Sequence, residues 1–340
     1  MANQEVSTDD AEIKLWASKF QYANHGFAGW SPDENASVND SNATIYGPNE
    51  TITRDNLPAD FSTKGLKLYA VWVESSGNLQ DWTCPNNETF PVGKVIALKD
   101  IRDNNVYTVA KLADEDCWMV ENLRLSNVDS NGNNINLDSN NTDNPATSIT
   151  NDDGFTSNHL SATSNSWCNI TGSEACMDQS KLNTKNTKQS QSASDVYGYG
   201  NYYNWYSATA GTRTYSQGAG DASGSVCPKG WSLPVGGYTS TTPKSFSYLD
   251  KALGGSGGNQ SGDAGIAQSK VWRSFPNDFI YSGGQHGNSA VSRDVSGFYW
   301  SRTAYDSNDV YILNFENGYL TSRSHNKKYY GYTVRCVFGV

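Results

Sequence analysis

Apolar and polar residues alternate along several short stretches of this chain, and this period of two predicts β-strands with one buried face. The alternation begins near the N-terminus, where Ile13 and Leu15 flank a lysine, and it returns in the closing part of the chain. Asn317–Gly318 separates two of these stretches and is a strong signal for a hairpin turn. The predicted strands cover residues 13–16, 66–73, 106–112, 311–315, 319–321 and 332–338.

One stretch has helical spacing instead. The run FSYLDKAL (246–253) repeats its apolar residues at three- and four-residue intervals, and Gly254–Gly255 follows it as a stop signal. Asn, Asp, Ser and Thr dominate residues 126–195, which we expect to fold as an ordered loop closed by Cys168 and Cys176. Short strands, long polar loops and one or two helices predict a mostly β protein of the α+β class.

The same patterns divide the chain of 340 residues, a length that allows about one to three domains. Residues 10–75 form a first β-rich unit, and residues 76–90 carry Gly, Asn and Pro, which is typical of a linker. Residues 91–340 form a second, larger unit. We therefore expect a small N-terminal module followed by a head domain.

Composition narrows the class of protein. The chain has 35 Asp and Glu against 25 Lys and Arg, and no cluster of five or more basic residues, which argues against a nucleic-acid partner. Hydrophobic residues make up 36% of the chain but aromatic residues 12%, so Trp, Tyr and Phe must supply much of the core. No apolar stretch is long enough to span a membrane, and residues 1–10 do not have the pattern of a signal peptide.

The cysteines point to an oxidising compartment. Their number is even, no CxxC pattern joins them, and the four histidines are too scattered to complete a zinc site. This favours disulfides and an extracellular or cell-surface location, with attachment to a membrane or cell wall through a segment absent from this sequence. The alternative is a set of buried free thiols. The six cysteines are Cys84, Cys117, Cys168, Cys176, Cys227 and Cys336.

Three stretches of the first unit are similar to the Listeria–Bacteroides repeat, a small β-rich module of bacterial surface proteins. They are GFAGWS (26–31), IYGPNETIT (45–53) and LYAVW (68–72). The resemblance implies a stalk or spacer, whose aromatic residues form a core and not a ligand site.

The head carries five ordered motifs: CWMVENLRL (117–125), GNYYNWYSA (200–208), CPKGWSLP (227–234), GFYWSRT (297–303) and GYTVRCV (331–337). In this order they resemble the Fibrobacter succinogenes major paralogous domain, over about three-quarters of the chain. The resemblance implies a C-type-lectin-like fold, similar also to the formylglycine-generating enzymes. We expect the tryptophans of these motifs to be core residues, namely Trp118, Trp205, Trp231 and Trp300.

The layout of these motifs suggests a disulfide scheme. It pairs Cys227 with Cys336, Cys84 with Cys117 and Cys168 with Cys176, although the sequence alone leaves the connectivity open. A formylglycine-generating oxidase would need paired reactive cysteines that hold copper. Cys227 and Cys336 are the only cysteines after residue 200, and both lie where a disulfide is expected. No GxSxG or HExxH motif occurs either, so we expect no enzymatic activity and no required cofactor.

The sequence also contains a candidate calcium site. Asn127, Asp129, Asn131 and Asp138 nearly match an oxygen-ligand loop, with Gly132 at the sixth position. The match departs from the pattern at its first and last positions, and no entering helix is evident. The alternative is an Asn- and Gly-rich turn. The lectin-type calcium motifs Glu-Pro-Asn and Trp-Asn-Asp are absent.

The region 281–332 carries the strongest indication of function. Tyr, Ser, Asn and Gly are concentrated there, which is the chemistry of antibody-like binding surfaces. These residue types also follow from changes at adenines in Asn-type codons. In its placement and composition, this region resembles the variable proteins of diversity-generating retroelements, in which the variable positions lie just before the C-terminus. The predicted contact residues are Tyr281, His286, Arg302, Tyr305, Asp306, Asn308, Tyr311, His325, Tyr329 and Tyr330.

Together these patterns predict a surface-displayed or secreted protein that binds a protein or glycan ligand on another cell or surface. Tyrosines would anchor the ligand and Arg302, Asp306 and Asn308 would set polar specificity. An ordinary polar surface, a fixed-ligand adhesin and a structural cell-surface domain are the alternatives. In a structural subunit, the tyrosines of 281–332 would be buried.

Overall fold

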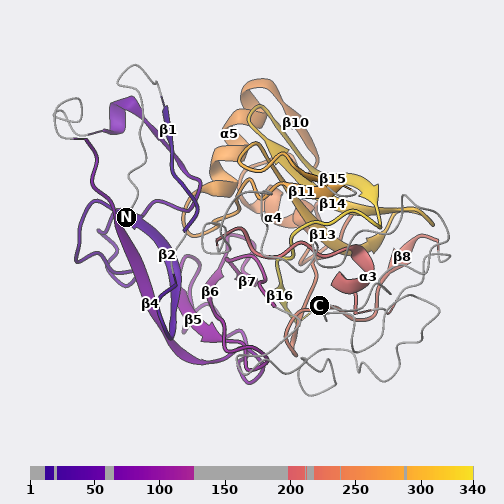
Figure 1. Cartoon of the computed structure of the whole chain (residues 1–340), viewed down its shortest axis with the longest axis horizontal. Coiled ribbons are helices and arrows are strands. Elements are labelled where there is room, and N and C mark those ends of the chain that lie inside the picture. The colour runs from indigo at the N-terminus through magenta and orange to yellow at the C-terminus, as the bar shows by residue number, and fades with distance from the viewer. Residues whose placement is uncertain are drawn as a thin grey trace.

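The computed structural model describes residues 12–18, 21–57, 65–125, 198–210, 212, 218–237, 239–286 and 289–339. The described residues form a mostly β structure with a few helices, which confirms the predicted fold class (Figure 1). None of the helices in these residues combines the length and the apolar character needed to cross a membrane.

The largest sheet has seven strands in the order β2-β4-β5-β6-β7-β16-β9. Neighbouring strands are antiparallel except for β4 and β5, which are parallel. Strand β6 is buried along its whole length and lies near the middle of the sheet. The strands are β2 (His25–Ser31), β4 (Tyr69–Asn78), β5 (Val95–Lys99), β6 (Val106–Lys111), β7 (Cys117–Met119), β9 (Trp231–Ser232) and β16 (Val337–Phe338).

This sheet runs through the segment predicted as a linker. Strand β4 reaches Asn78 and pairs with β2 on one side and β5 on the other. Leu79 and Phe90 are buried, and the Trp82 ring stacks on Trp231 at a centroid distance of 5.8 Å. The predicted division into two domains stays a prediction, but residues 76–90 are packed against the head.

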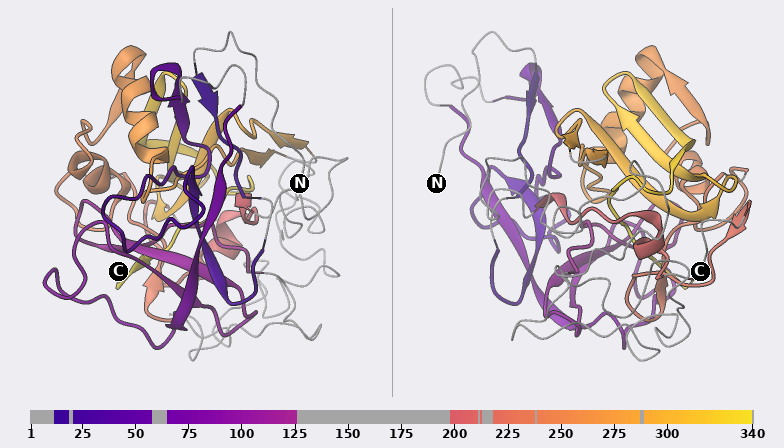
Figure 2. Two further views of the ribbon diagram at one scale, coloured as in Figure 1. Left: turned by 90° about the vertical axis from the view of Figure 1, so that its left-hand side faces the viewer. Right: turned by 45° about the vertical axis from the view of Figure 1, so that its right-hand side comes forward.

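The second sheet has five antiparallel strands in the order β10-β15-β14-β13-β8. It lies on the opposite side of the molecule from β2 and β4 (Figure 2). The predicted turn at Asn317–Gly318 is confirmed, since it joins β14 to β15. The strands are β8 (Gly220–Asp221), β10 (Asn259–Ser261), β13 (Ser296–Ala304), β14 (Asp309–Glu316) and β15 (Tyr319–Lys327).

The remaining described strands form two small sheets. In one, β1 (Glu12–Lys14) pairs with β3 (Thr51–Thr53), and in the other, β11 (Gly284–His286) pairs with β12 (Ser289–Val291). A 3-10 turn, η1 (Arg54–Asn56), follows β3.

The described helices are α3 (Trp205–Ala208), α4 (Phe246–Ala252) and α5 (Gly262–Arg273). Helix α4 confirms the predicted helix, and the Ser245 hydroxyl caps it by accepting the Tyr248 N–H at 3.0 Å. Helix α5 was not predicted from the sequence.

The core confirms the expected role of the motif tryptophans, because Trp118, Trp205, Trp231 and Trp300 are all 0% exposed. The predicted strand 332–338 is wrong over most of its length, because only Val337–Phe338 forms a strand. Its earlier part makes isolated bridges through Tyr332 and Thr333, and Arg335 is buried with its guanidinium donating to backbone carbonyls. This segment therefore passes through the core without a continuous ladder.

Two of the predicted disulfides are confirmed: Cys84 is bonded to Cys117, and Cys227 to Cys336. The third predicted pair, Cys168–Cys176, lies outside the described residues. Two disulfides are compatible with an extracellular protein.

Candidate ligand-binding surface

Three predicted contact residues meet at one end of the five-stranded sheet. Tyr311 on β14 and His325 on β15 are directly opposite in the strand register. The Tyr305 ring, just after β13, stacks on His325 with centroids 4.2 Å apart and an interplanar angle of 6°. It also meets Tyr311 edge-on at 5.2 Å. We call Tyr305, Tyr311 and His325 the open cluster, because Tyr305 is 43% exposed and His325 is also exposed.

Two charged residues flank the open cluster. Asp309 and Lys327 face each other two register pairs further along β14 and β15, with Lys327 Nζ 2.7 Å from Asp309 Oδ1. His325 Nδ1 lies 3.3 Å from the other carboxylate oxygen of Asp309. The hydrogen bond from its ammonium to Asp309 raises the pKa of Lys327. The surface thus combines stacked rings with a charge of each sign.

The turn between β13 and β14 carries two more predicted residues. The Asp306 carboxylate accepts the N–H groups of Asn308 and Asp309, both at 2.7 Å, and these bonds lower the pKa of Asp306. The carbonyl of Asn308, which is exposed, accepts the N–H of Lys328. Asp306 therefore shapes the turn that presents Tyr305.

Two glycines form the floor under Tyr311. A Cβ added to Gly237 would lie 2.2 Å from the Tyr311 ring, and one added to Gly236 would lie 2.6 Å from the Tyr311 Cβ. Gly237 also has a φ of +72°, which other residues rarely adopt. The Tyr311 ring can lie where it does because Gly237 lacks a side chain, while the missing side chain of Gly236 leaves room for the Tyr311 Cβ and the Ser301 hydroxyl.

A second group of rings lies deeper. His286, Phe298, Tyr330 and Tyr332 form what we call the inner cluster. His286 stacks on Tyr330 at 3.8 Å, and Phe298 stacks on Tyr332 at 4.9 Å. The Tyr332 hydroxyl lies 2.9 Å from His286 Nε2 and accepts from Asn326 Nδ2 at 2.7 Å. Burial lowers the pKa of His286.

Tyr329 lies at the margin of the inner cluster. Its ring meets Tyr330 edge-on at 5.0 Å, and both rings are partly exposed. The structure therefore places six of the ten predicted contact residues in or beside two aromatic groups, and Tyr329 and Tyr330 are partly exposed at the edge of the inner group.

Tyr281 and Arg302 lie in neither group. Tyr281 is 3% exposed, its hydroxyl is hydrogen bonded to Ser269, and the Arg273 guanidinium lies 4.6 Å from its ring centroid. Arg302 is half-buried and donates from Nε and Nη2 to the Ala222 carbonyl, which holds β8 beside β13. Both side chains are committed to contacts within the protein.

Tyr281 does border a cavity of about 370 Å³, whose lining also includes residues of the β1–β3 sheet and of α5. Lys14 and Arg273 also line it, and burial lowers the pKa of Lys14. Lys14 donates to the backbone carbonyl of Asp294. The cavity lies apart from the open cluster, since none of the open-cluster residues lines it.

The calcium candidates Asn127, Asp129, Asn131 and Asp138 lie outside the described residues. Within the described part of the chain, no group of three or more His, Cys, Asp or Glu side chains is placed to hold a metal ion.

Sequence reasoning missed Asp309, Lys327, Gly236 and Gly237. Asp309 and Lys327 lie two positions from Tyr311 and His325, so the two-residue period of a strand places them on the same face. That signal was available within each strand. The hairpin at Asn317–Gly318 does not by itself fix how the two strands pair at these residues, because a β-bulge between Ile312 and Asn314 shifts the register. The glycine floor comes from a distant segment, and nothing in its local sequence indicates it.

Comparison with known proteins found no matching family model, no matching curated protein and no matching solved structure.

Proposed function

We propose that this chain is an extracellular binding protein that recognises a protein or glycan ligand through the open cluster. The observation that carries the proposal is the exposed stack of Tyr305 on His325, held over Tyr311. Exposed aromatic rings offer rigid contact area at a low cost in conformational entropy. Asp309 and Lys327 add polar partners beside the rings.

The scaffold supports this use. The rings project from paired strands and a turn fixed by Asp306, so they are held in place before a ligand arrives. Preorganised contact residues lose less entropy on binding. Cys227 and Cys336 are joined in a disulfide, which makes a pair of reactive thiols unavailable at these positions and gives the oxidase alternative no support.

Binding to arrays of glycans and of cell-surface proteins tests the proposal. We expect Tyr305→Ala and His325→Ala to abolish any interaction that the wild type shows. The matched control is Tyr22→Ala, because Tyr22 is also exposed and also stacks on a histidine, His25, at 4.0 Å in another part of the molecule. Loss of binding in the control alone, or in no variant, would contradict the proposal.

We infer further that the surface is of the variable type. The observation that supports this inference is that the exposed residues of the open cluster are grouped within 305–325. Trp300 and Cys336, on either side of this range, are buried. Sequencing of the region coding for 270–340 across one natural population tests this. Changes at adenine-containing codons with Trp300, Gly331 and Cys336 constant would support diversification, and a uniform sequence would indicate a fixed-ligand adhesin.

A further inference from the structure

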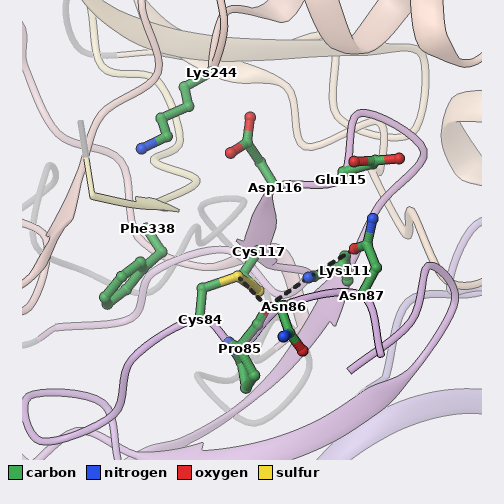
Figure 3. A pocket seen from close by; sticks show the side chains of 10 residues that line it. All are labelled: Cys84, Pro85, Asn86, Asn87, Lys111, Glu115, Asp116, Cys117, Lys244 and Phe338. Carbon is green, nitrogen blue, oxygen red and sulfur yellow. Dashed lines mark hydrogen bonds between the residues drawn. A yellow bond between two sulfur atoms is a disulfide. The ribbon is translucent and has the colours of Figure 1, made fainter. Parts of the chain in front are cut away.

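The two described disulfides lie in different environments. Cys227 and Cys336 are both 0% exposed and lie in the main core. Cys117 is 1% exposed, but its partner Cys84 is only partly buried. Both Cys84 and Cys117 line a cavity of about 450 Å³ (Figure 3). One disulfide is therefore within reach of a small solute and the other is not.

Two lysines line the same cavity. Lys111 on β6 is directly opposite Cys117 on β7 in the strand register, so their side chains leave the sheet on the same face. Lys244 lies at the other side of the opening (Figure 3). Glu115 and Asp116 also line the cavity, so the formal charges of its two lysines and two carboxylates are equal in number.

These features meet the requirements of thiol–disulfide exchange. An attacking thiolate needs access to one sulfur, and the reaction is faster when the departing thiolate is stabilised. A neighbouring ammonium group stabilises a thiolate. Cys84 supplies the accessible sulfur, and Cys117 supplies a departing sulfur whose cross-strand neighbour is Lys111.

We propose that the Cys84–Cys117 disulfide is a site of reversible modification by low-molecular-weight thiols. The thiolate of the small molecule attacks Cys84 Sγ and forms a new S–S bond with it. The bond between Cys84 and Cys117 breaks, and its electron pair leaves on Cys117 as a thiolate. The small thiol is oxidised to the mixed disulfide and Cys117 is reduced, so no further reagent is needed. The reverse attack by Cys117 restores the original bond.

The surrounding contacts hold the Cys84 segment in place after the bond opens. Lys111 Nζ donates to the Pro85 carbonyl at 2.6 Å and to Asn87 Oδ1 at 2.9 Å. Trp82 packs against Trp231 and, edge-on, against Phe338. These contacts keep Cys84 near Cys117, which favours re-formation of the bond over unfolding.

The test treats the native full chain with increasing concentrations of reduced glutathione, blocks free thiols with iodoacetamide and maps the peptides by mass spectrometry. We expect a glutathione adduct on Cys84 and alkylation of Cys117 at concentrations that leave Cys227–Cys336 intact. Circular dichroism should show the native fold at those concentrations. Earlier or simultaneous opening of Cys227–Cys336, or an adduct on Cys117 and not on Cys84, would overturn the proposal.

A variant pair tests the role of the cavity charge. Lys244→Gln should slow the reaction with glutathione, which is anionic, by roughly two- to fivefold, as expected for loss of one partly screened charge. Lys251→Gln is the matched control, because Lys251 is exposed on α4 and does not line the cavity. Equal rates for wild type and both variants would show that the cavity does not guide the thiol.

Discussion

The open cluster and the inner cluster both combine tyrosine rings with a histidine, but they lie on different strands and differ in what surrounds each ring. In the inner cluster, Tyr332 is 0% exposed and its hydroxyl is hydrogen bonded to His286 and Asn326. In the open cluster, Tyr305 stacks on His325 and is 43% exposed. Tyrosine content in a region therefore does not define a binding surface. The position of each ring relative to the core decides whether it stabilises the fold or meets a ligand.

The largest effect should come from removing the centre of the inner cluster. Tyr332→Ala leaves a cavity beneath Phe298 and Trp300, which pack on its ring at 4.9 and 4.7 Å. We expect a loss of about 3–5 kcal/mol in the free energy of unfolding, as for other large buried rings. Denaturant unfolding measures it. A loss no larger than that of Tyr305→Ala would erase the distinction between the clusters.

Removing only the hydroxyl should have a smaller effect. Tyr332→Phe takes away the acceptor of Asn326 Nδ2 and the partner of His286 Nε2. We expect a loss of about 1–3 kcal/mol, because the partners left behind are partly buried polar groups. The matched control is Tyr305→Phe on the exposed ring, for which we expect a change within about 0.5 kcal/mol. Equal losses in the two variants would contradict the assignment of Tyr332 to the interior.

The pH dependence of stability should distinguish the inner cluster as well. Burial lowers the pKa of His286 in the folded protein, so the folded state favours the neutral ring. The contribution of His286 is fully present above the ordinary histidine pKa of about 6.5 and is lost as pH falls through the lower folded value. His286→Gln should therefore lose less stability than the wild type between pH 8 and pH 5 in urea unfolding. A greater loss in the variant would show the opposite sign.

The smallest effect on stability should come from the open cluster. Tyr305→Ala removes an exposed ring stacked on His325, and we expect a loss of no more than about 1 kcal/mol. The same variant should abolish ligand binding. Thermal unfolding beside the array measurement separates the two effects. A large loss of stability together with binding would assign Tyr305 to the fold.

Much of the fold follows from the sequence where one face of an element is apolar. The strands around Asn317–Gly318 and helix α4 have clear periods and were predicted. Helix α5 has no such period, because its buried face includes Gln268, Ser269 and Arg273 together with Trp272. A helix that buries polar residues gives no apolar stripe for the sequence to reveal.

The residue types of the candidate site could be predicted from the sequence, but their positions in space could be predicted less well. Tyr305, Tyr311 and His325 were selected for their chemistry, and the structure places them together. Tyr281 was selected on the same grounds, but its chain segment enters the core, where the Asn49 side chain accepts its N–H. A tyrosine side chain has the same chemistry at the surface and in the core. The burial of Tyr281 depends on a contact more than 200 positions away, and no local pattern encodes it.

The glycine floor has a consequence for how this surface can change over generations. Gly237 leaves a space that the Tyr311 ring fills, and Gly236 leaves room for the Tyr311 Cβ. A side chain smaller than tyrosine at position 311 leaves this space partly empty and meets nothing at Gly237, whereas a side chain at position 237 would displace the ring. The tolerance for substitution is therefore one-sided: position 311 can take a smaller side chain, while the evolutionary constraint on size falls on the two glycines beneath it.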